Sequence, residues 1–292
     1  LFAGAGATVV PGSAAGQVMA ETGRVSVSHV GVTVTLEHAF ANPVVIVSVN
    51  TVNGGQEVVT RISAVTADSF FVQLQEPSQL DGNHAHELVS FMVVEAGDWL
   101  LPDGSVLRAG LEDMSGLSSS GYVPVAFDAS FGSAPSVLGQ VQTVNDPDFV
   151  KARIDGRDAA GFGLALEEDQ INNGGTHGSE TVGWGALDHG PGAWTGDADG
   201  FVFEAGTHGA GSGFSHHAFA AGFVAAPVML GGVASANDAD PAELRMTGLT
   251  ALGVDFRVEE DRSADWETSH GAEQIDWIAI GGEGLLIGEM IV

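Results

Sequence analysis

The stretch "HGAEQIDWIA" at residues 270–279 has two counterparts, "HGSETVGWGA" at 177–186 and "HAHELVSFMV" at 84–93. In each stretch a His is followed by a Glu at the third place and by a large aromatic residue at the seventh. The three histidines, His84, His177 and His270, are 93 residues apart. Because similarity at a fixed long period is typical of an internal repeat, this stretch indicates one unit built three times.

Further markers recur at a spacing of 92 residues. Each copy has a proline, an asparagine, an arginine and a glutamate in register: Pro43, Pro135 and Pro227; Asn53, Asn145 and Asn237; Arg61, Arg153 and Arg245; Glu76, Glu168 and Glu260. We therefore predict three tandem repeats of about 92 residues, at 18–112, 113–205 and 206–292. The Gly- and Ser-rich stretches 115–121 and 206–214 are predicted to link them.

Each copy has the pattern of β-structure. "SFFVQLQ" at 69–75 and "ELVSFMVV" at 87–94 alternate with period two, as half-buried strands do, and "NGG" and "NDPD" are turn sequences. We predict an all-β chain of three antiparallel β-sandwiches. We expect them to pack as a pseudo-threefold trimer within one monomeric chain. The same alternation makes the aromatic a core residue and leaves the Glu buried, where a carboxylate needs a partner.

The composition limits the partners and the environment that we expect for this chain. The 292 residues include 38 acidic and nine basic side chains, a formal net charge of −29. Such a surface repels nucleic acid and anionic membranes, and it suits high salt or the binding of cations. The absence of cysteine excludes disulfides. No apolar run approaches the roughly 20 residues of a membrane span, so we expect no membrane insertion.

The ends of the sequence indicate a fragment. It starts at Leu1 without Met, has no signal peptide, and stops at "GEMIV". We interpret it as part of a larger bacterial protein that is secreted or displayed on the cell surface.

The order of an aromatic, a proline and an apolar strand, then "TADSFFVQL" at 66–74, then a final strand with "WIA", resembles the H-type lectin domain. "DWETSHGAEQIDWIAIG" at 265–281 carries the resemblance best. It implies a small β-sandwich that forms trimers and holds sugars between protomers, gripped by an Arg and by an aromatic and a His before the last strand. The histidines and arginines are present in all three copies here, but copies 1 and 2 lack an aromatic corresponding to Trp266.

The repeated charged residues allow more than one role. Arg61, Arg153 and Arg245 fit a salt bridge to a repeated glutamate, or hydrogen bonds to sugar hydroxyls. The loop histidines could contact a ligand, anchor the loop by hydrogen bonds, or converge on zinc or a similar metal if the copies pack around an axis.

Asn53, Asn145 and Asn237 end strands at turns, so each fits either a bond to its own backbone or a sugar contact. The acid pairs in "NDPD" and "NDAD" make calcium a possible cofactor, although no complete calcium loop occurs. No cofactor is certain from the sequence.

The sequence shows no nucleophile elbow, zincin motif or phosphate-binding loop. Repeated weak sites gain affinity together, so we predict a non-catalytic module that binds carbohydrate or polysaccharide between the repeats or at their loops. The predicted sugar-binding residues are Trp266, His270, His177, His84, Arg61, Arg153, Arg245, Asn53, Asn145 and Asn237. Trp99 is a further stacking candidate. The alternatives are a calcium-rigidified spacer or adhesin segment without sugar binding, and a polysaccharide-degrading enzyme whose acid pairs act on glycosidic bonds.

Overall fold

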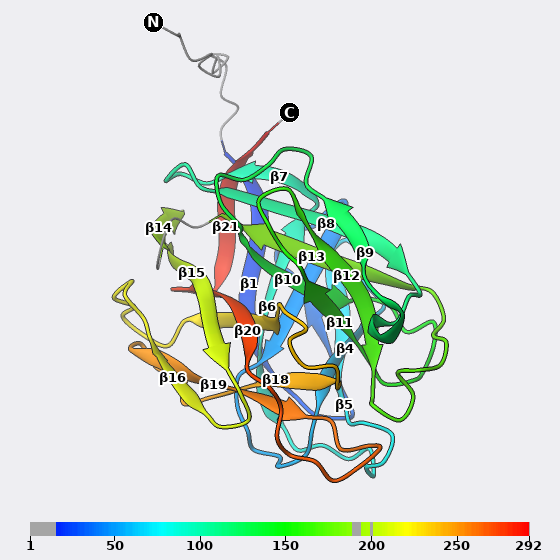
Figure 1. Cartoon of the computed structure of the whole chain (residues 1–292). Helices are drawn as coiled ribbons and strands as arrows, with labels where there is room; N and C mark the ends of the chain where they lie inside the picture. Colours follow the sequence, from blue (N-terminus) through cyan, green and yellow to red (C-terminus); the bar gives the residue numbers. More distant parts are fainter. Residues whose placement is uncertain (1–15, 189–193, 199–200, 292) are drawn as a thin grey trace, which may run out of the picture.

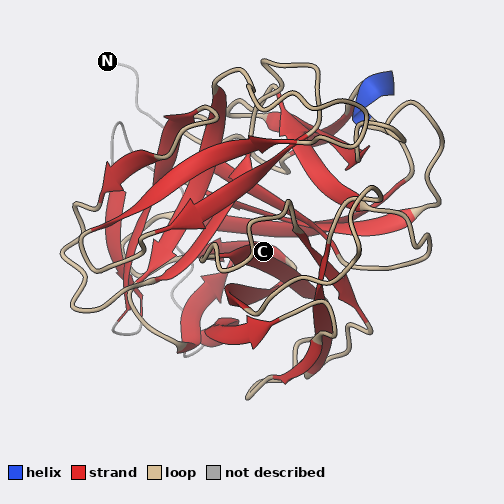
Figure 2. Cartoon of the chain, turned by 90° about the horizontal axis from the view of Figure 1, so that it is seen from below, coloured by secondary structure: helices blue, strands red, loops and turns tan. Residues whose placement is uncertain are grey.

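The computed structural model describes residues 16–188, 194–198 and 201–291 (Figure 1). In this part of the chain it has 21 strands and one 3-10 turn, η1, which is the blue element in Figure 2. All strand pairs in the sheets are antiparallel. The predicted all-β class with several antiparallel sheets is confirmed.

The first group of elements is β1 (Gln17–Val27), β2 (Val32–Thr35), β3 (Pro43–Val49), β4 (Val59–Ser63), β5 (Ser69–Gln75) and β6 (Glu87–Glu95). The next group is β7 (Gly97–Leu100), β8 (Val106–Met114), η1 (Ser118–Ser120), β9 (Val123–Ala126), β10 (Ser136–Val141), β11 (Val150–Asp155), β12 (Gly161–Glu168) and β13 (Glu180–Leu187). The last group is β14 (Trp194–Ala198), β15 (Phe201–Ala210), β16 (Ser215–Ala218), β17 (Val228–Val233), β18 (Ala242–Thr247), β19 (Gly253–Glu260), β20 (Glu273–Ile280) and β21 (Gly284–Met290).

The sheets repeat two strand orders. Three-stranded sheets have the orders β2-β5-β4, β9-β12-β11 and β16-β19-β18. A four-stranded sheet has the order β14-β15-β20-β17, and two stretches of the eight-stranded sheet match it, namely β7-β8-β13-β10 and β21-β1-β6-β3. The eight-stranded sheet is therefore two such four-stranded sheets joined where β7 pairs with β21.

The strands that begin with the repeated glutamate are buried on both faces. On β6, Val89 and Phe91 pack in a cluster formed with β2, β3, β4 and β5, whereas Met92 and Val94 pack in a different cluster. The predicted alternation is thus present, with Phe91, Trp184 and Trp277 all in the core as expected. What the pattern did not predict is that the opposite face of these strands is also covered.

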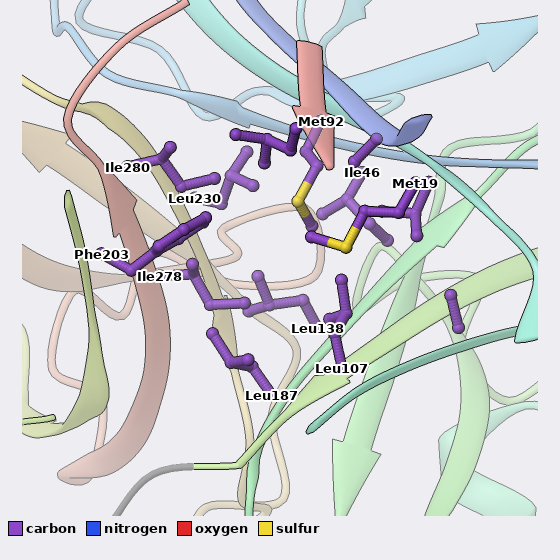
Figure 3. Close-up of a cluster of buried hydrophobic side chains, with 14 of the residues drawn as sticks. Met19, Ile46, Met92, Leu107, Leu138, Leu187, Phe203, Leu230, Ile278 and Ile280 are labelled. Carbon is purple, nitrogen blue, oxygen red and sulfur yellow. The ribbon is translucent and has the colours of Figure 1, made fainter. Parts of the chain in front are cut away.

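That second cluster is the centre of the molecule. It combines side chains from all of the larger sheets, among them Met19 of β1, Leu107 of β8, Phe203 of β15 and Leu286 of β21. Figure 3 shows side chains of this cluster, including Met19, Leu107 and Phe203, meeting from strands far apart in the sequence. Three further clusters each lie between one larger sheet and one three-stranded sheet. Burial of apolar surface on both faces of the larger sheets therefore joins the repeats into one body.

Buried polar side chains also connect the repeats. The backbone N–H groups of Val45, Val137 and Met229, which are 92 residues apart, donate to Gln142, Asp276 and Ser90 at 2.7, 2.8 and 3.1 Å. Each acceptor belongs to another copy, so copy 1 bonds copy 2, copy 2 bonds copy 3 and copy 3 bonds copy 1. We call the interface between copies 1 and 2 the first junction, that between copies 2 and 3 the second junction, and that between copies 3 and 1 the third junction. The three contacts thus form a closed cycle.

The first and last strands lie side by side (Figure 1). Thr22 of β1 pairs with Gly284 of β21, Gln17 pairs with Gly288, and the other edge of β21 pairs with β7. The C-terminal strand therefore completes the sheet that contains the N-terminal strand. The repeat boundaries predicted at 112/113 and 205/206 fall inside β8 and β15.

The predicted linkers are corrected by the strand assignments. Residues 206–210 belong to β15, and 115–121 lies between β8 and β9, where it forms η1. Both stretches are therefore inside a strand group. The abundance of glycine indicated a turn or a linker at these places. In β15, however, a Cβ atom on Gly206 would lie 3.2 Å from the Trp277 side chain. The glycine therefore leaves room for this core residue.

Candidate functional site

Each repeated histidine lies between two glutamates inside the protein. The Nδ1 atoms of His84, His177 and His270 lie 3.0, 2.7 and 2.5 Å from carboxylate oxygens of Glu76, Glu168 and Glu260. Their Nε2 atoms lie 3.2, 3.5 and 3.2 Å from Glu87, Glu180 and Glu273. The first glutamate ends, or directly follows, one strand and the second begins the next, so the loop between them brings the ring into place.

The second glutamate also caps a turn. In copy 1 the Glu87 carboxylate accepts bonds from the backbone N–H groups of Asn53 and Gly54, both at 2.8 Å, and from the Thr51 hydroxyl at 2.5 Å. The Asn53 amide donates to the His86 carbonyl at 2.8 Å. Asn145 and Asn237 make the corresponding bonds to Ser179 and Ala272. The asparagines are exposed, and their amide groups bond the backbone of the histidine loop instead of their own turn.

The repeated arginines reach into the neighbouring copy. The Nη2 of Arg61 donates to the Asp146 carbonyl at 3.0 Å, Nη1 of Arg153 to the Ala242 carbonyl at 3.5 Å, and Nη1 of Arg245 to the Gln56 carbonyl at 2.8 Å. Arg61 and Arg153 also lie 3.7 and 3.1 Å from Glu180 and Glu273. The predicted arginine–glutamate pair therefore exists at the first and second junctions, and it spans two copies.

In copy 3 the pKa shifts favour a charged histidine between two carboxylates. Burial disfavours a charged imidazole at His270, but the hydrogen bonds to Glu260 and Glu273 outweigh it and raise its pKa to about 9. Burial likewise works against the Glu273 carboxylate, yet bonds from His270, Ser235 and two backbone N–H groups lower its pKa to about 2. Burial raises the pKa of Glu260. An imidazolium between two carboxylates is the charge state that these shifts favour near neutral pH.

These networks correct the expected accessibility of the repeated residues. The three histidines are 2–6% exposed and the three arginines are each 1% exposed. The sequence analysis treated the histidines as accessible loop residues, because a polar residue before a strand commonly faces water. Here two carboxylates flank each ring inside the protein instead, and all the ring nitrogens except Nε2 of His177 make a hydrogen bond to one of them. A sugar has no access to these six side chains in this structure, so they favour the loop-anchor and salt-bridge roles.

The acidic turn tips have bonding roles as well. Asp146 and Asp238 accept backbone N–H bonds from Gly178 at 3.0 Å and Gly271 at 2.8 Å, which fasten the turn to the histidine loop. These bonds lower the pKa of both carboxyl groups. Within the described residues no group of three or more His, Asp or Glu side chains is placed to hold a metal ion. The converging-histidine hypothesis is therefore not realised there.

The two tryptophans proposed for stacking lie in opposite environments. Trp99 is 1% exposed in the central cluster and its Nε1–H donates to the Glu95 carbonyl at 2.8 Å. The prediction that Trp99 stacks on a ligand is therefore wrong, because β7 continues a sheet that the sequence did not reveal. Trp266 is 89% exposed, in the loop that precedes His270.

Two cavities lie at the third junction, near the repeated loops. One, of about 300 Å³, is lined by Gln79 and Leu80 of copy 1 and by residues 262–266 of copy 3, including Trp266. A second, of about 410 Å³, is lined by Gly55 of copy 1 and by residues of copy 3 that include Arg257 and Arg262. Arg262 borders both, and its Nε donates to the buried carboxylate of Glu57.

Several residues of the junctions were missed by the sequence analysis. Asp276 is buried, and its Oδ2 lies 2.6 Å from Nε of Arg157. Burial raises its pKa to about 7 although Arg157 and the Val137 N–H oppose that rise. The signal was an acid within the apolar strand "QIDWIAI", which indicates a buried partner.

Comparison with known proteins gives one related segment. Part of halomucin from Haloquadratum walsbyi is 34% identical over 263 residues, which is 85% of this chain and 3% of halomucin. The chain thus spans a very small share of that protein. No protein-family model and no solved structure matches the chain. Among the described residues no helix has the length and apolar character to cross a membrane.

Proposed function

We propose that this chain is a non-catalytic carbohydrate-binding module of a large secreted or cell-surface protein that works in high salt. The similarity to a segment of halomucin, whose name refers to salt and to mucins, supports the extracellular setting. The net charge of −29 supports the saline one, because salt screens the repulsion among the acidic side chains.

One observation carries the binding role. Trp266 is 89% exposed and borders a cavity of about 300 Å³ between copies 3 and 1. An indole this exposed adds little to the stability of the fold, whereas its flat apolar face can cover the face of a sugar ring. Gln79, Ser263 and Asp265 supply polar groups around it for sugar hydroxyls. The binding site thus lies at one junction of the three.

A screen against glycans and polysaccharides tests this proposal. The intact chain is screened in calcium buffer and again in EDTA, and binding to one sugar class is expected. Trp266→Ala should weaken binding about fivefold or more, since stacking contacts of this size are worth about 1 kcal/mol or more. Leu252→Ala, which removes another exposed apolar side chain (78% exposed), serves as the matched control and should change nothing. Absence of binding in both buffers would overturn the proposal.

A second candidate function is a structural segment that binds no sugar. The buried positions of the repeated histidines and arginines favour it, because these residues stabilise the junctions. The same screen separates the two functions: a spacer binds no glycan and leaves every glycan intact. If calcium rigidifies it, EDTA lowers its Tm. Release of new reducing ends from a polysaccharide would instead indicate the enzymatic alternative.

A further inference from the structure

This protein has few basic side chains, and most of them are largely buried. Of the nine, six have side chains that are 14% exposed or less: Arg61, Arg108, Lys151, Arg153, Arg157 and Arg245. The other three are Arg24 at 22%, Arg257 at 25% and Arg262 at 32%. The two most exposed cations of the chain therefore line one cavity, the 410 Å³ cavity of the third junction.

The acids that share this cavity are already engaged. Glu259 lies 2.6 Å from Nη2 of Arg257, and Glu260 lies 2.5 Å from Nδ1 of His270. Glu57 is paired with Nε of Arg262. Glu259 and Glu260, the two carboxylates that line this cavity, therefore each have a cationic partner, which offsets the negative charge that an entering anion meets there.

Donor groups remain on both arginines. Arg262 uses Nε for Glu57, and Arg257 uses Nη2 for Glu259; their other guanidinium N–H groups have no hydrogen-bond partner among the described residues. The Nε of Arg257 is even buried without a partner. The guanidinium of Arg257 lies 4.8 Å from the ring centroid of Phe214, which helps to fix its position. A guanidinium with open N–H groups is the usual receptor for carboxylate and sulfate.

This arrangement belongs to the third junction alone among the three. Counted from the repeated glutamates Glu76, Glu168 and Glu260, the position of Arg262 is occupied by Gln170 in copy 2 and by Ser78 in copy 1. The position of Arg257 is occupied by Ala165 in copy 2 and by Gln73 in copy 1. The loop from this glutamate to the histidine is also longest in copy 3, with a separation of ten residues against nine and eight. The two extra residues relative to copy 1 accompany the exposed Trp266.

We infer that the third junction binds an anionic saccharide, with Trp266 against the sugar face and with Arg262 and Arg257 donating to its carboxylate or sulfate group. The two cavities share Arg262, so one sugar chain can contact the indole and both guanidinium groups. This inference rests on the carbohydrate-binding function proposed above and names the ligand class for that site.

The test compares charged and neutral forms of the same sugars. Oligogalacturonate and its carboxyl-reduced counterpart are titrated into the intact chain by calorimetry at constant high salt, and a sulfated galactan oligosaccharide and its desulfated counterpart form a second pair. The charged member of at least one pair should bind about tenfold more tightly, as expected for a charge-assisted hydrogen bond. The pair that shows the preference distinguishes carboxylate from sulfate.

Variants show which side chains cause the preference for the charged sugar. Arg262→Gln and Arg257→Gln should each remove most of the preference and leave the neutral sugar unchanged, whereas Trp266→Ala should weaken both sugars. Arg24→Gln is the matched control, because Arg24 is similarly exposed and paired with Glu283 at 2.8 Å. Arg262→Gln alone leaves the Glu57 carboxylate buried without its cationic partner. The double variant Glu57→Gln with Arg262→Gln removes both charges and so avoids an unpaired buried carboxylate.

The outcomes separate this inference from the proposed function. Equal binding of charged and neutral sugars, or an Arg262→Gln effect no larger than that of Arg24→Gln, would overturn the anionic class while sugar binding stands. If no member of either pair binds and the wider glycan screen is also empty, the proposed function fails and this inference fails with it.

Discussion

Replacing His270 by Gln should remove a contribution to stability that depends on pH. The pKa of His270 in the folded protein is about 9, against an ordinary value of 6.5. Because the folded pKa is the higher one, the stabilisation is complete below about pH 6.5 and is lost as the pH rises through about 9. At about 1.4 kcal/mol for each pKa unit, the contribution is about 3 kcal/mol.

The measurement is a set of urea unfolding curves at constant high salt from pH 6 to pH 10. Wild type should be more stable than His270→Gln at pH 6, and the difference should shrink by about 3 kcal/mol by pH 10. An NMR titration of the imidazole signals gives the folded pKa directly. Lost packing and lost neutral hydrogen bonds do not vary over this range, so the change with pH isolates the charge.

His216→Gln is the matched control. His216 also lies 2.8 Å from a carboxylate, that of Asp255, but its side chain is 59% exposed, and exposed pairs contribute little. His216→Gln should therefore change the free energy of unfolding by about 0.5 kcal/mol or less. A difference between wild type and His270→Gln that does not change with pH would refute the account of an imidazolium held between Glu260 and Glu273.

Three further outcomes follow from the packing. Trp99→Ala should lower the free energy of unfolding by about 3–5 kcal/mol because it empties part of the central cluster, while Trp266→Ala should change it by about 0.5 kcal/mol or less; urea curves at one pH compare the two. Asp276→Ala should cost about 3–5 kcal/mol, since it leaves the Arg157 guanidinium buried without its carboxylate, and the same curves measure it. Deletion of β21 should cause self-association, because it bares the edges of β1 and β7; light scattering after size-exclusion chromatography shows whether the chain stays monomeric.

Local patterns predicted the strands and their inner faces. Alternation around Phe91, Trp184 and Trp277 needs only neighbouring residues, so the sequence was sufficient to place these aromatics in the core. The burial of the glutamates that start β6, β13 and β20 followed from the same alternation, and it is confirmed.

Long-range partners could not be predicted in the same way. Nothing local to Arg61 indicates that its guanidinium donates to the Asp146 carbonyl of the next copy rather than to its own sheet. Trp99 was misassigned because β7 is only four residues long, and its burial depends on β8 and β21. The histidines were misjudged since two carboxylates that are separate in sequence enclose each ring. In each case the missing information is which distant segment covers the residue.

The pairing of the two end strands has a mechanical consequence. Gln17, at the start of β1, faces Gly288, near the end of β21, so a force that pulls the two chain ends apart acts at one end of this strand pair. Its hydrogen bonds would then break one after another, as a zipper opens, instead of sharing the load as they do when strands are sheared along their length. Once β21 peels away, the apolar side chain of Leu286 leaves the central cluster. Under tension between its ends, this module would yield first at the seam between its first and last strands.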